Sequence, residues 1–388
     1  MTHYDAIVLG VGGMGSAALY HLARRGLRVL GIERYNIPHE MGSSHGLTRI
    51  IRLAYYEHPS YVPLLRRAYE LWRQLENMAQ ERLLIITGSV DASPEDGEVF
   101  QGSKMSCDIH HLPHEVLDSH ELTGRFPGYH LPQGIVALYQ PDGGFLLSER
   151  CIVAHVSAAL ELGAEVHGQE RVLGWDAKGH GVEVGTDRGR YGADKLVICA
   201  GAWGAKLVPE LSTLAVPERQ VLAWFQPARP ALFRVHSFPV FNMAVAEGRY
   251  YGFPVYGIPG FKVGRYHHLE QRVDPDQMDR EAHPEDEEVL RSFTARYFPD
   301  AAGPTVSLKT CLFTNTPDEH FILDLHPEFP QVCLAAGFSG HGFKFCSVVG
   351  EIMADLAQTG QSRHDLQLFR LRRFREASTC HRPSPGVE

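Results

Sequence analysis

The start of the chain shows two short apolar runs separated by an amphipathic segment. Residues 5–10 are apolar almost throughout, which predicts a β-strand buried on both faces. Residues 16–25 carry apolar side chains at helical spacing, and residues 27–31 form a second apolar run. A buried strand, a helix and a second buried strand predict a β-α-β unit in a parallel sheet.

Three glycines lie between the first predicted strand and the helix. Gly10, Gly12 and Gly15 follow the spacing G-x-G-x-x-G. The first permits a tight turn, the second lets a pyrophosphate approach the backbone, and the third lets the helix pack closely on the strand. Glu33 closes the second strand, where a carboxylate can bind ribose hydroxyls. The pattern predicts a dinucleotide-binding fold rather than a glycine-rich turn without a ligand, and it leaves FAD and NAD both open.

A polar, turn-rich stretch, residues 36–48, follows where an NAD enzyme usually has a third strand, and we expect it to lie as a loop on a ligand. His45, Arg49 and Arg52 come close together near its end, and the two arginines would share one face of any helix. Three potential cations beside a dinucleotide suit an anionic flavin ring or a substrate carboxylate. On spacing alone, solvated surface arginines are the alternative.

The middle of the chain is less regular. Apolar spacing predicts amphipathic helices over residues 61–75 and 147–162, and a strand over residues 165–172. Residues 89–141 contain many His, Pro and Gly residues and are predicted to be irregular. The histidines of this stretch lack a recognised metal-ligand spacing, so no metal site is expected there.

A second glycine turn follows a predicted hairpin at residues 182–190. Residues 196–199 form an apolar strand that ends in Ala200 and Gly201, where backbone can again pass close to a nucleotide. A second turn that returns to the same ligand is expected of FAD folds. Val172, at the end of an earlier predicted strand, is expected to contact the cofactor with it.

Residues 220–266 are rich in aromatic side chains and proline and contain several alternating apolar runs. This predicts an antiparallel sheet that forms a roof over the ring end of the cofactor. Lys262 alternates with Phe261 and Val263, so its side chain should point to the opposite face of the strand. Taken alone, such a lysine is typical of a solvent-exposed position.

Two compact signals mark the last third of the chain. Cys311 precedes a cluster of acidic residues, and residues 335–345 run from a strand end through glycines into a predicted helix. Gly340 and Gly342 belong to this loop, and a glycine-rich loop that opens a helix is a second anion cradle. Lys344, in the first turn of that helix, would add positive potential near a flavin ring.

Composition excludes several classes of protein. The 388 residues, 44% hydrophobic and 21% charged, suit a globular protein of two or three packing units. A net charge of -9 without a dense basic block makes nucleic acid an unexpected partner. The apolar runs are too short for a membrane span and no secretory signal is visible, so we expect a cytoplasmic protein. Seven scattered cysteines form neither a disulfide framework nor a C-x-x-C metal pair.

These motifs together resemble those of the monomeric sarcosine oxidase family, which includes N-methyltryptophan oxidase, among the D-amino-acid-oxidase-like flavoproteins. The resemblance runs from DAIVLGVGGMGSAA through SSHGLTRIIRLAY, GFKVG and CLFTNTPDEHFILDLHPE to AAGFSGHGFKF. It implies a monomer of mixed α/β (α+β) class. A discontinuous Rossmann-like FAD-binding domain would comprise residues 1–85, 145–215 and 320–388, and an antiparallel-sheet substrate domain residues 86–144 and 216–319.

The resemblance also implies an activity. Family members oxidise the C–N bond of a secondary amino acid, pass a hydride equivalent to FAD, release an imine that hydrolyses, and reoxidise the flavin with O2 to hydrogen peroxide. By motif, the implied roles are the covalent link to FAD for Cys311, substrate carboxylate binding for Arg52 and Lys344, the flavin face for Arg49 and His45, oxygen reduction for Lys262, and the substrate pocket for Tyr251.

Two departures from the family pattern bear on the substrate. Phe313 stands where sarcosine-specific members carry tyrosine, and either His267 or His268 could be the family's histidine near the substrate amine, because one residue is inserted. Sarcosine is the favoured substrate, and a larger N-methyl amino acid such as N-methyltryptophan is an alternative. A flavin dehydrogenase with another acceptor, a flavin-binding protein without turnover and an NAD-dependent dehydrogenase also remain open.

Overall fold

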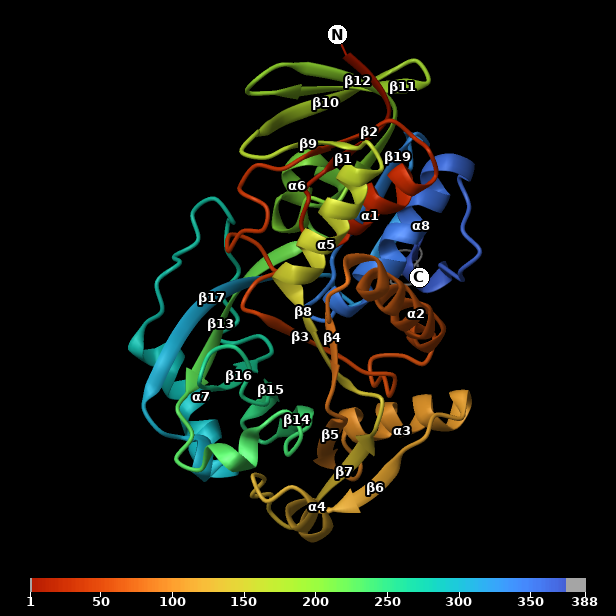
Figure 1. Ribbon diagram of the computed structural model, residues 1–388. Helices are drawn as coiled ribbons and strands as arrows, with labels where there is room; N and C mark the ends of the chain where they lie inside the picture. Colours follow the sequence, from red (N-terminus) through yellow and green to blue (C-terminus); the bar gives the residue numbers. More distant parts are fainter. Residues whose placement is uncertain (1, 375–388) are drawn as a thin grey trace, which may run out of the picture.

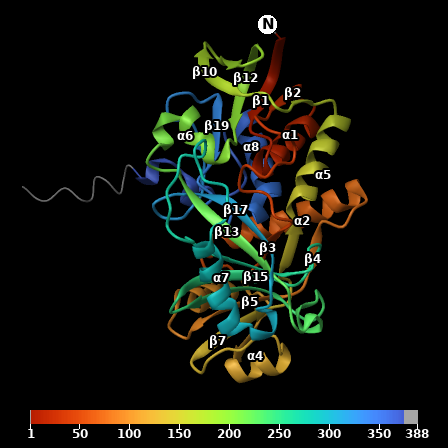
Figure 2. The same cartoon turned by 90° about the vertical axis from the view of Figure 1, so that its left-hand side faces the viewer.

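A computed structural model describes residues 2–374 of the chain. In Figures 1 and 2 these residues form an upper part, built on one sheet and its helices, and a lower part built on a second sheet. A three-stranded sheet lies between them. The long strands of the lower sheet extend toward the upper part, so that the two parts meet along their length.

The upper sheet is parallel at its centre. β1 (Thr2–Leu9) pairs in parallel with β2 (Val29–Ile32) and with β12 (Arg190–Ile198); β9 (Glu165–His167) extends the β2 edge, and β19 (Val332–Ala336) pairs with the end of β12. Antiparallel partners complete it: β10 (Val172–Lys178), β11 (Gly181–Thr186) and β18 (Ile322–Leu325). The central strands are buried on both faces, which explains their unbroken apolar runs.

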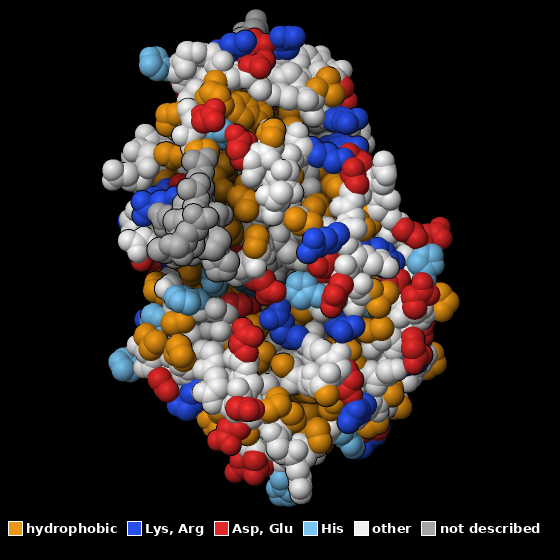
Figure 3. Space-filling view, turned by 180° about the vertical axis from the view of Figure 1, so that it is seen from behind, with side chains coloured by type: hydrophobic (Ala, Val, Ile, Leu, Met, Phe, Trp, Pro, Cys, Tyr) orange, Lys and Arg blue, Asp and Glu red, His pale blue; other side chains and the backbone are white. Residues whose placement is uncertain are grey.

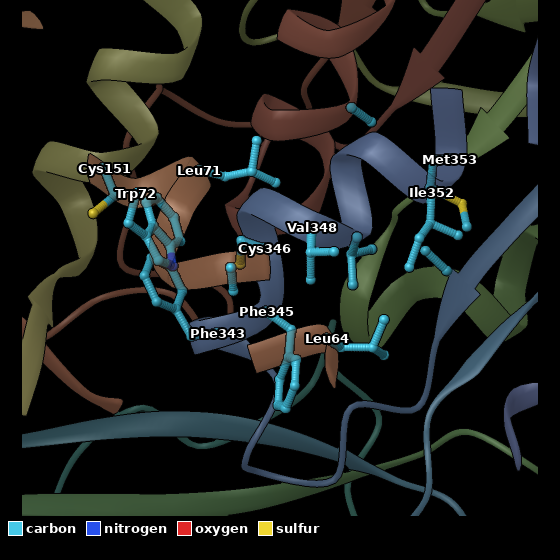
Figure 4. Packing of buried hydrophobic residues seen from close by; sticks show 14 of the residues in the cluster. Leu64, Leu71, Trp72, Cys151, Phe343, Phe345, Cys346, Val348, Ile352 and Met353 are labelled. Carbon is cyan, nitrogen blue, oxygen red and sulfur yellow. The ribbon is translucent and has the colours of Figure 1, made fainter. Parts of the chain in front are cut away.

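Helices pack together beside this sheet. They are α1 (Gly13–Arg24), α2 (Tyr61–Ala79), α5 (Ser148–Glu161) and α8 (Cys346–Thr359), with the short α6 (Gly204–Leu207) after β12. Figure 4 shows Trp72 of α2 against Phe343, near Cys151. The indole Nε1 of Trp72 donates a hydrogen bond of 2.9 Å to the carbonyl of Lys344. The buried face of α2 therefore holds the turn that carries Lys344.

The small sheet connects the two parts. β3 (Thr48–Ile51) and β4 (Leu84–Ile86) both pair antiparallel with β8 (Gly144–Leu147). Arg49 lies on β3, whose strand form rules out a helix that would put Arg49 and Arg52 on one face. The two arginines therefore point to different surroundings.

The lower sheet has the strand order β17-β13-β16-β15-β14-β5-β7-β6. Its strands are β5 (Ser89–Pro94), β6 (Glu115–Asp118), β7 (Ile135–Gln140), β13 (Val216–Phe225), β14 (Val240–Val245), β15 (Gly248–Phe253), β16 (Phe261–Arg265) and β17 (Thr305–Asn315). All neighbours are antiparallel except β14 and β5. The predicted antiparallel sheet is present and also includes strands from before residue 141, and it is called the roof sheet below.

One face of this sheet carries an aromatic core. Phe241 and Phe261 stack with ring centres 6.2 Å apart, and Phe293 of α7 (Pro284–Tyr297) stacks on Tyr250 at 3.8 Å. Because side chains alternate along a strand, the residues between these positions point to the other face, toward the upper part. That second face carries the chemistry described below.

Some local predictions were wrong. Residues 89–141 are not irregular: they contain β5, β6 and β7 as well as α3 (Glu98–His110) and α4 (Ser119–Arg125). The predicted strand at residues 165–172 is split into β9 and the start of β10. α8 begins at Cys346, so Lys344 lies in the preceding 3-10 turn (Phe343–Phe345) rather than in the helix itself.

Figure 3 shows acidic and basic side chains intermingled over the face opposite to that of Figure 1. No helix among residues 2–374 combines the length and apolar character needed to cross a membrane. Over the same residues, no group of three His, Cys, Asp or Glu side chains has an arrangement that could hold a metal ion.

Candidate active site

The first glycine loop has the geometry that each of its glycines was expected to provide. Gly10 has φ +83°, and a Cβ there would lie 2.7 Å from the carbonyl oxygen of Cys199. A Cβ on Gly15 would lie 1.7 Å from the carbonyl oxygen of Gly10, so the helix packs against the strand without room for a side chain. A Cβ on Gly12 would meet nothing within 4 Å. The space over Gly12 is therefore open to a ligand.

Glu33 is buried and held by the backbone. One carboxylate oxygen accepts a hydrogen bond of 2.9 Å from the amide of Val11, and the other accepts one of 3.0 Å from the amide of Tyr35. These bonds fix the carboxylate beside the glycine loop, where it can still accept from ribose hydroxyls because each oxygen has two lone pairs.

A cavity of about 340 Å³ joins these features to the second glycine loop. The predicted cofactor residues that line it are Gly10, Gly12, Glu33, Val172, Ala200, Gly201, Gly340 and Gly342. Arg49 and Phe313 line it as well, while Gly15 and Cys311 lie just behind its wall. Residues from well-separated stretches of the chain thus converge on one space that suits an extended dinucleotide.

The second glycine loop closes against the roof sheet. Gly340 has φ +77°, and a Cβ there would lie 2.3 Å from the ring of Phe313. A Cβ on Gly342 would lie 2.5 Å from the Cβ of Phe338. The loop can therefore approach the sheet only because it lacks these side chains, and it presents its backbone to the cavity.

Cys311 and Arg49 meet beside the cavity. The sulfur of Cys311 is buried, lies 3.6 Å from Nη2 of Arg49 and 3.8 Å from the carbonyl oxygen of Ser43, which lines the cavity. Arg49 also donates to the carbonyls of Ser43 and Thr48. The sulfur of Cys311 and the guanidinium of Arg49 thus lie in contact beside the cavity.

Lys262 is buried on the cavity-facing side of the roof, as the alternation predicted. Its ammonium group donates to the carbonyls of Gly46 and Thr48 at 2.7 and 2.8 Å and to the Thr48 hydroxyl at 2.9 Å. It also lies 4.3 Å from the ring centre of Phe253. Burial, followed by repulsion from Arg49, lowers the pKa of Lys262 well below its ordinary value.

His45 is buried, and neither of its ring nitrogens has a hydrogen-bond partner among the described residues. Burial and the nearby Arg49 lower the pKa of His45 to about 3, so the imidazole is neutral. Buried polar groups rarely lack partners. An orphaned imidazole next to the open cavity is thus a second sign, besides the open Gly12, that a ligand belongs here.

Arg52 and Lys344 lie near one another, but they differ in how many of their N–H donors are already bonded to protein acceptors. Nη1 of Arg52 donates to the carbonyl of Ala54, Nη2 donates to Glu57 at 2.9 Å, and Nε lies 3.5 Å from Asp91. Lys344 donates to one acceptor, the carbonyl of His341, at 2.7 Å. Burial, followed by repulsion from Arg52, lowers the pKa of Lys344 to about 7.

The two candidate histidines lie away from the cavity wall. His267 has 34% of its side chain exposed and is held between Glu218 at 3.1 Å and Glu319 at 2.9 Å. These carboxylates raise the pKa of His267 to about 9, so it is a cation rather than a base at neutral pH. His268 is fully buried on the other side, where it contacts Asp286 at 3.0 Å.

Tyr266 takes the cavity-facing position that was expected of a histidine. Its ring lies 5.2 Å from that of Tyr251 and 5.7 Å from that of Phe313. The ring of Tyr251 lies over Gly264, and a Cβ added at Gly264 would come within 2.5 Å of this ring. An aromatic wall thus faces the space next to Phe313.

Two members of this wall, Tyr56 and Arg249, were not among the candidate site residues predicted from the sequence. The guanidinium carbon of Arg249 lies 4.0 Å from the ring centre of Tyr266 and 5.4 Å from that of Tyr56. The alternation Arg249, Tyr251, Phe253 along β15 could have shown that Arg249 faces the same side as Tyr251. It was missed because a single arginine in a strand is usually a solvated residue.

A glycine-rich β-α-β turn, an acidic strand end and a second glycine loop around one cavity, roofed by a sheet with a buried lysine, define a dinucleotide-dependent redox enzyme. The comparison with protein families agrees, and names the cofactor. The chain belongs to the FAD dependent oxidoreductase family, whose model matches residues 5–356. The predicted fold class and family resemblance are confirmed.

Relatives extend over nearly the whole chain. A monomeric sarcosine oxidase of Bacillus sp. (strain NS-129) is 43% identical over 377 residues, covering 96% of this chain and 97% of the relative. An N-methyl-L-tryptophan oxidase of Yersinia pestis (strain Pestoides F) is 35% identical, with coverage of 96% and 100%. Among solved structures, the open form of NikD, an unusual amino acid oxidase essential for nikkomycin biosynthesis, has a TM-score of 0.84 at 26% identity, with coverage of 95% and 98%.

Proposed function

We propose that this flavoenzyme oxidises the C–N bond of an N-methyl amino acid with O2, and that sarcosine is a substrate. The products are the demethylated amino acid, formaldehyde and hydrogen peroxide. The substrate gives up two electrons and two protons to become an imine, water hydrolyses the imine, and O2 receives the electrons and protons. The FAD, when bound, accepts the hydride equivalent and passes its electrons to O2.

The observation that carries this proposal is the buried, fully hydrogen-bonded Lys262 on the cavity-facing side of the roof. A lysine is expensive to bury, and three acceptors from residues 46 and 48 hold this one in place. A positive charge held in a fixed position favours the first electron transfer to O2, because it stabilises superoxide as it forms. A dehydrogenase that avoids oxygen has no need of such a group.

The remaining residues support binding and orientation. We propose that Gly10, Gly12, Glu33 and the loop with Gly340 and Gly342 hold the dinucleotide, that Cys311 is joined to it covalently, and that Arg49 and His45 contact its ring. Arg52 and Lys344 would bind the substrate carboxylate beside Tyr251. Lys344 has donors to spare in this structure, whereas the substrate must compete with Glu57 for Arg52.

The proposed division of labour follows the arrangement of the sheets. Residues 2–85, 145–215 and 320–374 would form the FAD-binding domain, and residues 86–144 and 216–319 the substrate domain. Residues 1 and 375–388 of the predicted FAD-binding domain lie outside the described residues. By likeness to relatives that are monomeric sarcosine oxidases, we propose a cytoplasmic monomer. His267 is not proposed as a catalytic base, because two carboxylates keep it protonated and outside the cavity wall.

A larger N-methyl amino acid is the second candidate substrate. Phe313 lacks a hydroxyl and packs against Tyr266, so this side of the pocket is apolar. The relative that is an N-methyl-L-tryptophan oxidase shows that this fold serves such a substrate elsewhere. Each added methylene in an apolar pocket is worth about 1 to 3 kcal/mol, so an apolar wall would favour the larger substrate.

The decisive experiment follows flavin bleaching under anaerobic conditions and peroxide release in air, with sarcosine, N-methyltryptophan and proline. Bleaching by an N-methyl amino acid, with one peroxide per amine oxidised, is the expected result. Bleaching without peroxide would indicate a dehydrogenase that uses another acceptor. Flavin that none of the amines bleaches would contradict amine oxidation altogether.

A further inference from the structure

Arg249 belongs to the same face of the roof sheet as the residues that meet the cofactor and substrate. Tyr251 pairs with Gly264, and Phe253 pairs with Lys262, in the antiparallel register of β15 and β16. Because directly paired residues share a face and alternate positions along a strand do too, Arg249 lies on the side of Tyr251 and Lys262. Its side chain is 19% exposed, so it is not a solvated surface arginine.

The guanidinium of Arg249 is incompletely satisfied by the protein. Nη2 approaches Glu319 at 3.4 Å, at the long end of the hydrogen-bond range, and the buried Nε has no partner among the described residues. Glu319 is 40% exposed and is also held by His267 at 2.9 Å. The counter-charge thus lies on the outer side of Arg249, while a buried donor remains free. Such an orphaned donor costs free energy unless a ligand accepts from it.

Arg249 shares an aromatic wall with the cations assigned to the substrate carboxylate. The guanidinium carbons of Arg52 and Arg249 lie 4.6 and 5.4 Å from the centre of the Tyr56 ring. Lys344 lies 5.2 Å from the adjacent Tyr55 ring. A small molecule with two acidic groups could therefore contact both ends of this wall at once.

We propose that Arg249 binds a second acidic group of the substrate, so that this enzyme prefers N-methyl dicarboxylic amino acids of the aspartate or glutamate type over sarcosine. The inference rests on the proposed function and specifies its substrate class. A carboxylate suits the site better than a neutral polar group, because a guanidinium offers paired donors and forms stronger hydrogen bonds with an ionised acceptor. The oxidised C–N bond and the balance of the reaction are unchanged.

The test compares kcat and KM for sarcosine, N-methyl-L-aspartate and N-methyl-L-glutamate. In the unaltered enzyme, kcat/KM should be at least about tenfold higher for one of the diacids than for sarcosine. Arg249→Met should lower kcat/KM for that diacid at least about tenfold, mainly by raising KM. The kcat/KM for sarcosine should change by less than about threefold. Arg249→Lys should give an intermediate loss, because one ammonium replaces the paired donors.

Two further variants separate binding from structural support. Arg265→Met removes an arginine from the neighbouring strand, where it faces the other way and donates to the carbonyl of His268, and should leave the diacid preference intact. Glu319→Gln removes the competing charge and should lower KM for the diacid. A purely structural ion pair would instead make Arg249→Met and Glu319→Gln harm both substrates alike, which would overturn the inference.

A binding measurement keeps the inference apart from the proposed activity. Glutarate, which has two carboxylates and no amine, should perturb the flavin absorption spectrum of the holoenzyme, and Arg249→Met should weaken its binding at least about tenfold. The inference would be wrong if glutarate binding were independent of Arg249, or if a diacid were oxidised no better than sarcosine. Neither result would contradict the proposed amine oxidase activity. Arg249-dependent glutarate binding without oxidation of any amine would leave the anion site in place and remove the proposed function.

Discussion

Nη2 of Arg49 lies 3.6 Å from the sulfur of Cys311, although the two residues are 262 positions apart in the chain. The contact joins β3 of the small sheet to β17 at the edge of the roof. It puts a permanent cation beside the sulfur that is proposed to carry the flavin. The fold thereby brings a sulfur and a guanidinium from distant parts of the chain together beside the cavity.

Replacement of Cys311 by serine should release the flavin from its covalent link. After precipitation with acid, flavin should stay in the pellet for the unaltered protein and appear in the supernatant for Cys311→Ser, because a serine hydroxyl is far less nucleophilic than a thiolate. Cys107→Ser, on α3 and away from the cavity, is the matched control and should retain flavin in the pellet. Flavin in the supernatant of the unaltered protein would refute the link.

Replacement of Lys262 by methionine should affect the oxygen reaction rather than amine oxidation. Loss of a preorganised electrostatic group typically costs about 10²- to 10³-fold in rate, so reoxidation of the reduced flavin should slow by this factor. Stopped-flow mixing of reduced enzyme with O2 measures it directly, and the rate of anaerobic bleaching by substrate should change far less. Equal slowing of both steps would show that Lys262 supports the site as a whole.

The two glycines Gly12 and Gly15 should respond differently to an added methyl group. Gly15→Ala forces a Cβ to within 1.7 Å of a backbone oxygen and should cost about 3 kcal/mol of stability or more. Gly12→Ala meets only open space and should leave apoprotein stability within about 0.5 kcal/mol. Its added methyl occupies the proposed pyrophosphate position, so the flavin-to-protein ratio should fall. Thermal unfolding measures the stability of both variants, and flavin absorbance measures the flavin-to-protein ratio. A Gly12→Ala protein with its full complement of flavin would contradict the proposed pyrophosphate position at Gly12.

The sequence predicts the β-α-β unit well because glycines and apolar runs act locally. It predicts β5 poorly, since that strand buries Asp91, which reads as a turn residue. In the fold, Asp91 accepts hydrogen bonds from Ser103 and Asn242, and Asn242 is 151 positions away. Hydrogen-bond partners so distant in sequence cannot be inferred from a local pattern. The sequence of a buried strand with polar residues therefore resembles that of a loop.

The candidate site shows the same limit. Lys262 could be placed on the correct face by alternation, because the pattern of one strand suffices for that. The importance of Arg249 depends on Tyr56, which lies on a different part of the chain, and on the register between β15 and β16. The insertion before His267 could not be resolved either, because spacing alone does not show that Tyr266 takes the cavity-facing position.

The ion pairs of His267 predict how stability depends on pH. Hydrogen bonds that His267 donates to Glu218 and to Glu319 raise the pKa of His267 from 6.5 to about 9, so the stabilisation is complete below pH 6.5 and is lost as pH rises through 9. The hydrogen bond with His267 also lowers the pKa of Glu319 from 4.5 to about 2, so this pair weakens again as pH falls from 4.5 through 2.

His267→Gln should therefore lower the melting temperature most between pH 4.5 and 6.5, and its melting temperature should fall less than that of the unaltered protein between pH 6.5 and 9. The effect is moderate because solvent screens a side chain that is 34% exposed. His3→Gln removes a histidine from an exposed pair with Asp194 and should leave the profile unchanged. Melting temperatures of the three proteins, measured by calorimetry across this pH range, test this prediction. Parallel curves for His267→Gln and the unaltered protein would mean that the charge of His267 does not stabilise the fold.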